Sequence, residues 1–446
     1  MVSTDFLNAP IDRTSAESLD SQGLRLALVD TADRTAFEGW LQNEARGFHG
    51  PVQSAEVVER QLEGLAYRRT TGVWDSASPL SDTDDAETPV ATLSSWAGPL
   101  TVPGHRSVEA WSISGVTVSP THRRRGIARA LLESELRTAH SLGVPLAILT
   151  VSEATIYARY GFAPAVMAAD WTIDARRAAW TGPVAPGRLR FLSPEQARAD
   201  LETLLESVRL ESPGQVEPWP LQLDRITGLA GDDKDRIKHL RVIRYDDVAG
   251  DARGLAVYTV SEKDPLFGFS LDVEMLVASS DEAYAALWRF LLEQDLVSTV
   301  TANLRSDTEA VAWQIADFRA ARVTAQRDHL WTRILDVKAA LEARSYSAHG
   351  TIVLEVTDPL GFAEGRWLLE IADDGAGTVV PLIGDAPGDA AVVALGVNEL
   401  GALYLGGVSA VTLTRAGRIT EVRDGSATAI DASFRSAVTP WLSTWF

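Results

Sequence analysis

The sequence contains no cysteine. This absence excludes disulfide bonds, thiolate metal sites and a cysteine nucleophile, and it leaves the redox compartment undetermined. The chain also lacks an apolar run of about eighteen residues, the length that a membrane-spanning helix needs. Its N-terminus has neither the basic start nor the apolar stretch of a signal peptide. We therefore expect a cytoplasmic protein without a membrane span.

Positive charge is scarce, because 41 Lys and Arg residues stand against 61 Asp and Glu residues and give a formal net charge of −20 at pH 7. Nucleic acids and anionic membranes carry phosphate of the same sign, so we expect neither as a partner. A cationic substrate is favoured. The seven histidines show no spacing typical of metal ligands, so we also expect no metal.

A chain of 446 residues is too long for one ordinary hydrophobic core. We expect three domains, over residues 1–185, 186–332 and 333–446. Strands and helices alternate in the first two, which predicts α/β folds, and the pattern of the third is α+β. In the third domain, residues 411–414 are expected to form a strand.

Residues 74–88 are rich in Ser, Asp and Thr, so we expect a loop there. In the second domain a strand at 271–277, a helix at 281–294 and a strand at 297–304 repeat the order seen in the first. Either the two domains are an internal duplication, or two ordinary α/β stretches look alike.

The most informative segment is Val116-Thr-Val-Ser-Pro-Thr-His-Arg-Arg-Arg-Gly-Ile-Ala128. It predicts a strand, an arginine-rich turn and then a helix whose apolar residues recur up to Leu142. A helix N-terminus presents unpaired N–H groups, glycine lets a phosphate approach closely, and arginines add charge-assisted bonds. The segment therefore predicts a pyrophosphate-binding turn, with a solvated basic turn as the alternative.

The corresponding turn of the second domain reads Ser279-Ser-Asp-Glu-Ala-Tyr284 and has no glycine and two acidic residues. It is not expected to bind pyrophosphate. In the first domain, a strand at 145–151 leads to a short helix that carries Tyr157 and Tyr160. A phenol placed there can protonate a leaving thiolate, so either tyrosine is a candidate acid, or a core side chain.

The turn fits the Arg-x-x-Gly-x-Ala pattern of the Gcn5-related (GNAT) acetyltransferases. Together with Ser152-Glu-Ala-Thr-Ile-Tyr-Ala-Arg-Tyr-Gly-Phe162 and the chain end, it resembles the Eis (enhanced intracellular survival) family over the whole length. The resemblance implies two GNAT folds in tandem, the second degenerate, followed by a domain similar to sterol carrier proteins. Leu400-Gly-Ala-Leu-Tyr-Leu-Gly-Gly407 resembles part of that last domain.

The resemblance also implies an activity, which is N-acetylation of primary amines of aminoglycosides or polyamines with acetyl-CoA as co-substrate, in a homo-hexamer. Tyr157 would be the general acid, and the α-carboxylate of Phe446 the base. The residues that match the family's acetyl-CoA contacts are Val116, Thr117, Val118, Arg123, Arg124, Arg125, Gly126, Ile127, Ala128, Arg129, Ser152 and Glu153.

One departure concerns Trp445, which stands where family members can have an acidic residue that helps to hold a cationic substrate. Glu38 or Glu44 could take over this task. An α-carboxylate has a pKa of about 3.5, so a base at Phe446 needs burial or an intervening water. The end of the chain could also be an ordinary hydrophobic anchor. Two other functions stay open, namely acetylation of protein lysines and a non-catalytic acyl-CoA or lipid carrier.

Overall fold

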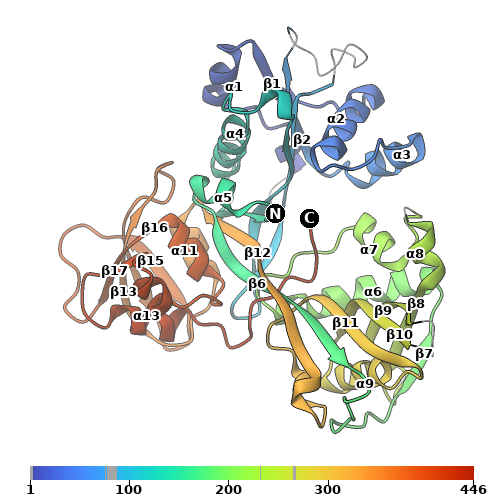
Figure 1. Ribbon diagram of the computed structural model, residues 1–446. Coiled ribbons are helices and arrows are strands. Elements are labelled where there is room, and N and C mark those ends of the chain that lie inside the picture. Colours follow the sequence, from blue (N-terminus) through green and yellow to red (C-terminus); the bar gives the residue numbers. More distant parts are fainter. Residues whose placement is uncertain (1–3, 76, 78–87, 232, 265–267) are drawn as a thin grey trace.

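The computed structural model describes residues 4–75, 77, 88–231, 233–264 and 268–446. Along the chain it forms three parts that meet at the centre, where the C-terminus also lies (Figure 1). Most of the loop expected over residues 74–88 falls outside the described residues. In the part of the chain that is described, no helix is long and apolar enough to cross a membrane.

The first part is an α/β unit with helices on both faces of its strands. Helices α1 and α4 contact one side of the sheet, and α2 contacts the other. Its elements are α1 (Arg13–Asp20), β1 (Leu24–Leu28), α2 (Arg34–Gly47), α3 (Ala55–Gly64), β2 (Arg69–Asp75), β3 (Ala91–Val102), β4 (Arg106–Val118), α4 (Ile127–Ser141), β5 (Leu146–Thr150), α5 (Ala154–Tyr157) and β6 (Ala163–Asp174).

The second part repeats this order of elements. Its strands β10 and β11 pair in parallel on either side of helix α9 in the chain, as β4 and β5 do around α4. The elements are β7 (Arg188–Phe191), α6 (Pro194–Val208), α7 (Pro220–Thr227), α8 (Lys234–His239), β8 (Leu240–Asp246), β9 (Ala252–Asp264), β10 (Gly268–Ala278), α9 (Asp281–Leu292), β11 (Val297–Arg305) and β12 (Ala321–Ile334).

The first two parts share one sheet of twelve strands, in the order β1-β2-β3-β4-β5-β12-β6-β11-β10-β9-β8-β7. Strand β12 lies between β5 and β6, antiparallel to both, although it follows the second part in sequence. Strand β6 pairs with β11 on its other edge. The two α/β units are therefore joined by main-chain hydrogen bonds, and the boundaries expected at 185/186 and 332/333 stay predictions.

The third part is α+β, with its own five-stranded sheet in the order β15-β14-β13-β16-β17. Its elements are α10 (Val337–Ala343), β13 (Gly350–Thr357), β14 (Gly365–Ile371), β15 (Gly377–Pro381), β16 (Ala391–Gly396), α11 (Val397–Tyr404), α12 (Ala410–Arg415), β17 (Ile419–Glu421) and α13 (Ser426–Phe434). The chain ends in a C-terminal segment, residues 435–446, without helix or strand.

The strand expected over residues 411–414 is wrong, because these residues belong to helix α12. Its β-branched residues favour a strand locally. However, the Ser409 side chain caps the helix by accepting a bond from the N–H of Thr412, and Asp431 accepts bonds from Ser409 and from the N–H of Ala410. Capping from a distant helix thus overrides the local preference.

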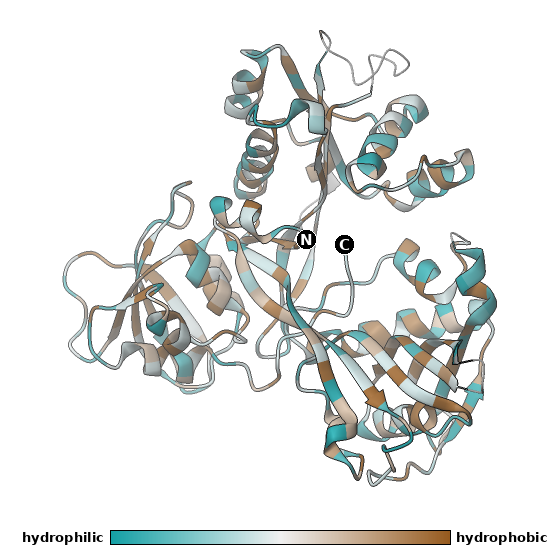
Figure 2. Ribbon diagram, viewed as in Figure 1, coloured by the Kyte–Doolittle hydropathy of each residue, from teal (hydrophilic) through white to brown (hydrophobic). Residues whose placement is uncertain are grey.

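A buried ion pair joins the third part to the shared sheet. Arg333 of β12 and Asp358 are both almost completely buried, and the guanidinium donates to both carboxylate oxygens at 2.7 and 2.8 Å. Arg333 also donates to the carbonyl of Tyr160 in the first part. Hydrophobic residues gather along the strands while the outer helices carry hydrophilic faces (Figure 2), so these few polar links are embedded in apolar packing.

Candidate active site

The central feature of the first part is a split between two parallel strands. Strands β4 and β5 pair only where Ala110–Ser112 lie beside Leu146–Ile148. Beyond these residues β4 runs on to Val118 along β3, and β5 runs on along β12. We name this opening the β4–β5 split. Along it the edge of β4 has no strand beside it and presents main-chain donors and acceptors to the opening.

A β-bulge bends β4 at the split. Ser114 pairs with Ser94 and Thr117 pairs with Thr92, so Gly115 and Val116 together face one residue of β3. Gly115 has a φ of +63°, a left-handed conformation that favours glycine. Because bulges increase local twist and bend the strand, this one turns β4 away from β5.

The predicted strand residues keep the free edge of β4 in place. Val116 and Val118 pack against the core on the α4 side. Thr117 is buried, and its hydroxyl lies 2.7 Å from that of Thr92. These three residues therefore present main-chain N–H and C=O groups to the split. Such groups can bond an amide-bearing arm such as pantetheine.

The arginine-rich turn forms an open cradle at the start of α4. Arg124 and Gly126 both have left-handed backbones, with φ of +63° and +75°. No atom lies within 4 Å of the place where a side chain on Gly126 would begin. Backbone N–H groups in such a turn, at the N-terminus of a fifteen-residue helix, form an anion-binding concavity. The cradle therefore has the geometry of an anion site and offers room for a pyrophosphate.

The arginines of the turn have different environments. Arg125 donates to Asp75 at 2.8 Å and to the carbonyl of Gln22 at 3.0 Å, and the ring of His122 lies 3.4 Å from the same carboxylate. These contacts hold the turn against β2. Arg129 pairs with Glu133 of its own helix. Arg123 and Arg124 are exposed.

Two further residues of the turn are apolar. Ile127 is buried against the core and Ala128 is half-buried, so their side chains anchor the first turn of α4. The exposed arginines and the main chain are left to face a ligand. The sequence predicted Arg125 as a ligand contact but did not point to its partner Asp75. The only available indication of Asp75 was that an acidic residue stands at the end of a strand.

Tyr157 lies just beyond β5, on α5, and is buried. Burial raises the pKa of its phenol, while a hydrogen bond with Ser152 opposes the rise and the nearby Glu153 adds to it. The phenol therefore keeps its proton at neutral pH. Tyr160 is also buried with a raised pKa, but its charged neighbours are Glu133, Arg129 and Arg159. Ser152 and Glu153 are both exposed.

The end of the chain reaches the same strand end. Thr150, the last residue of β5, donates through its hydroxyl to a carboxylate oxygen of Phe446 at 2.6 Å, and accepts from the Phe446 N–H at 3.2 Å. The half-buried ring of Phe446 packs edge-on against Trp96 at 5.3 Å. The structure thus brings the α-carboxylate to the end of β5, from which the helix of Tyr157 starts.

An acidic side chain lies at the bulge. A side chain on Gly115 would begin 3.1 Å from the Glu44 carboxylate. Burial raises the pKa of Glu44, against the opposing charges of Arg68 and Arg225. Arg68 itself stacks on Trp96, with its guanidinium 4.0 Å from the ring centre. Glu38, the other acid considered, is half-buried and pairs with the exposed Arg34.

Three large aromatic side chains of the first part have structural roles. Phe37, Trp40 and Trp111 are almost completely buried in the cores on either side of the sheet. Within the described residues, no group of three or more His, Asp or Glu side chains could hold a metal ion. The sequence did not predict a role for Thr150, because a threonine at the end of an apolar strand is common and indicates no particular function.

Comparison with known domain families gives the class. Two acetyltransferase (GNAT) domain models match residues 29–165 and 219–334, and a sterol carrier protein domain model matches residues 337–443. The predicted tandem of GNAT folds with a sterol carrier-like third domain is confirmed. The fold, the β4–β5 split and the cradle of α4 define an N-acetyltransferase, and GNAT domains imply acetyl-CoA as the donor.

Individual relatives give the family. An uncharacterized N-acetyltransferase of Streptomyces avermitilis is 35% identical over 94% of this chain and 97% of its own. N-acetyltransferase Eis of Mycobacterium tuberculosis is 32% identical over 76% of this chain and 81% of its own. The crystal structure of Eis1 from Mycobacterium abscessus superposes with a TM-score of 0.78, at 28% identity, over 95% of this chain and all of that one. The chain belongs to the Eis family of GNAT N-acetyltransferases.

The open space beside Gly126 predicts that adding a methyl group there weakens binding of the donor. In Gly126→Ala, a Cβ would stand where the pyrophosphate approaches, and losing one charge-assisted hydrogen bond of about 1.5–3 kcal/mol raises KM for acetyl-CoA roughly tenfold or more. Steady-state kinetics check this. The matched control is Gly143→Ala, which has the same φ of +75° and equally open space just after the other end of α4.

Both variants carry the same left-handed strain of about 1–2 kcal/mol, so they lose similar stability. Gly143→Ala is expected to keep the KM of the unmodified enzyme. Equal KM values in the two variants would show that the space beside Gly126 does not receive the donor.

Proposed function

We propose that the enzyme transfers acetyl from acetyl-CoA directly to primary amines of small polycations of the aminoglycoside or polyamine type. The observation that carries the proposal is the contact between the Phe446 carboxylate and Thr150 at the end of β5. Burying part of a charged chain end is costly unless it is paired, which favours a chemical purpose for its position.

The donor is held, in this proposal, by the main chain of Val116–Val118, by the turn Arg123–Arg129 and by Ser152 and Glu153. Acetyl-CoA supplies a thioester carbonyl to the β4–β5 split. The cradle of α4 neutralises the pyrophosphate through main-chain N–H groups, with Arg123 and Arg124 adding exposed positive charge. Arg125, engaged by Asp75, keeps the turn in shape.

The amine is attracted by negative charge around the split. Glu44 lies at the bulge of β4, and the whole chain carries a net charge of −20. Trp445 has no carboxylate to offer, and its ring packs edge-on against His329 at 4.5 Å. Glu44 thus takes the place that an acidic penultimate residue would fill for a cationic substrate.

Two groups of the chain move protons. The Phe446 carboxylate accepts the proton that the attacking amine loses, and Tyr157 donates a proton to the departing sulfur. The raised pKa of Tyr157 suits an acid, because the phenol is fully protonated before the reaction. The Thr150 hydroxyl, by donating to the carboxylate, fixes the direction of its oxygens.

Acetylation of protein lysines uses the same chemistry and is the alternative that the substrate experiment addresses. Assembly as a homo-hexamer and a cytoplasmic location are further parts of the proposal, supported by membership of the Eis family. Analytical ultracentrifugation of the purified chain measures the first of these directly.

The substrate class is tested by thiol release from acetyl-CoA with a panel of amines. Aminoglycosides and polyamines are expected to give turnover at a lower KM than a lysine-containing peptide, because several positive charges are drawn to the acidic split. A reversed order would favour protein acetylation. No release with any amine would favour an acyl-CoA carrier.

Tyr157→Phe is expected to lower kcat roughly a hundredfold, the usual contribution of a positioned acid, with little change in KM for acetyl-CoA. Because the phenol pKa is raised above 10, the unmodified enzyme should lose no activity to ionisation of this group up to about pH 10. Tyr160→Phe is the matched control and should stay near full activity. The opposite result would assign the acid to Tyr160.

One glycine added after Phe446 moves the carboxylate by a residue and is expected to lower kcat roughly tenfold or more, with the melting temperature unchanged. Phe446→Leu keeps the carboxylate at its place in the chain and should retain most turnover. Full activity of the extended chain would remove the carboxylate from the mechanism.

A further inference from the structure

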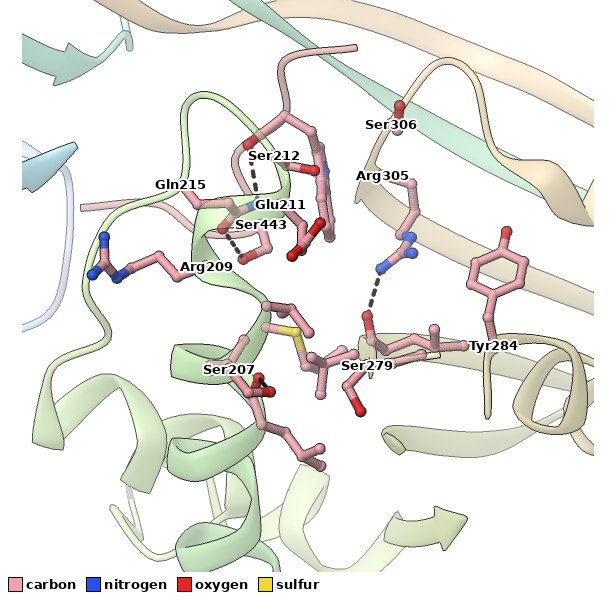
Figure 3. A pocket seen from close by; sticks show the side chains of 18 of the residues that line it. Ser207, Arg209, Glu211, Ser212, Gln215, Ser279, Tyr284, Arg305, Ser306 and Ser443 are labelled. Atoms are coloured by element: carbon pink, nitrogen blue, oxygen red, sulfur yellow. Dashed lines mark hydrogen bonds between the residues drawn. The ribbon is translucent and has the colours of Figure 1, made fainter. Parts of the chain in front are cut away.

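The second part has a split of its own. Strands β10 and β11 pair in parallel from Phe269 to Val273, and beyond that point Met275–Ala278 pair with β9 alone. A cavity of ≈ 720 Å³ lies there (Figure 3), lined by residues that include Met275, Tyr284 and Arg305 and by part of the C-terminal segment. It occupies the position that the β4–β5 split occupies in the first part.

This second split does not suit acetyl-CoA. The first turn of α9 is capped by Ser280 and carries Asp281 and Glu282, both exposed, so it repels phosphate. Arg305 reaches across from β11 and donates to the carbonyl of Leu276 on β10 at 2.9 Å. Arg305, labelled in Figure 3, thus bridges the two strands of the second split. By analogy with the first part, this is where a pantetheine arm would run.

The C-terminal segment packs against this bridge. The Trp441 ring stacks on Arg305 with the guanidinium 4.7 Å from its centre, and its indole N–H donates to the carbonyl of Leu304 at 2.7 Å. The main-chain N–H of Trp441 donates to Pro213. A segment without helix or strand is therefore fixed by bonds to the second part.

Gln215 makes the most specific of these contacts, and it is buried. Its amide nitrogen donates to the main-chain carbonyl of Trp441 at 3.0 Å, and its amide oxygen accepts from the Ser443 hydroxyl at 3.1 Å. Both side-chain groups of Gln215 are thus spent on the C-terminal segment. Further on, the ring nitrogen Nε2 of His329 donates to the carbonyl of Thr444 at 2.7 Å.

These bonds lie close to the end of the chain. Phe446 follows Ser443 by three residue steps, a span of about 10 Å when extended, so a shift at Gln215 is transmitted over a short distance. Misplacing a reacting group by about 1 Å can cost a hundredfold in rate. Holding the segment beside Ser443 therefore limits where the carboxylate can go.

We infer that the second split serves as the seat of the chain's own C-terminal segment, and that Gln215 is a positioning residue for the Phe446 carboxylate. The inference rests on the proposed function, because it gives the carboxylate a role in the reaction. Gln215 touches neither substrate nor donor and acts through the segment that it holds.

The test is a double-mutant cycle between Gln215→Leu and the chain extended by one glycine. Gln215→Leu removes both bonds and is expected to lower kcat about tenfold, with KM for acetyl-CoA unchanged. In the extended chain the same substitution should cost nothing more, because the carboxylate is already misplaced. Gln222→Leu is the matched control and should keep full kcat, since Gln222 is also buried and lines the same cavity, with its amide oxygen unpaired.

The two possible failures are distinguishable. Full activity of the extended chain overturns the proposed base, and the inference with it. Two results overturn the inference alone, both with a lowered kcat of the extended chain. In the first, Gln215→Leu has the kcat of the unmodified enzyme. In the second, the two reductions in kcat multiply in the double variant. If Gln215→Leu does not fold, Ser443→Ala removes one of the two bonds. Ser443→Ala is expected to lower kcat about threefold in the chain of normal length and not at all in the extended chain. An unchanged kcat of Ser443→Ala in the chain of normal length would overturn the inference.

Discussion

The structure depends on the insertion of strand β12 between β5 and β6. A strand that follows the second part in sequence pairs with Leu146–Thr150 on one edge and with residues of β6 on the other. Without it β5 would have a partner only at Ala110–Ser112, and the strand end that carries Thr150 would be an unsupported edge. The β4–β5 split can stay open because β12 holds its far wall.

The same strand joins the third part and the C-terminal segment to this wall. Arg333 ties it to Asp358 of the third part, and breaking such a buried pair leaves an unpaired charge at a cost of about 3–5 kcal/mol. His329 ties it to the C-terminal segment. Burial lowers the pKa of His329 to about 4, so the ring is neutral at physiological pH and donates through Nε2 without a charge. Position, rather than electrostatic attraction, is what this contact supplies.

Sequence reasoning succeeded where the signal was local. The periodicity of α4, the glycine before it and the arginines of the turn are all set by neighbouring residues, and the structure forms that helix and the cradle. It failed where distant segments decide. No local pattern at residues 321–334 predicts that β12 inserts into another unit. Likewise, residues 411–414 were expected to form a strand, but capping by Ser409 and Asp431 makes them a helix. The site residues near Phe446 were accessible through family resemblance, but Thr150 and Gln215 required the fold. The sequence named both Glu38 and Glu44, and only the fold places Glu44 at the bulge.

The two α/β units show how one topology supports opposite uses. Each has a parallel strand pair that separates beside a helix N-terminus, and the difference lies in a few side chains. In the first unit Gly126 leaves the helix start open and arginines surround it. In the second, Asp281 and Glu282 oppose an anion and Arg305 bridges the strands. Because a bridged split can no longer accept a pantetheine arm, its walls are available to bind protein instead, and the segment packed there is the one that ends at β5 of the first unit.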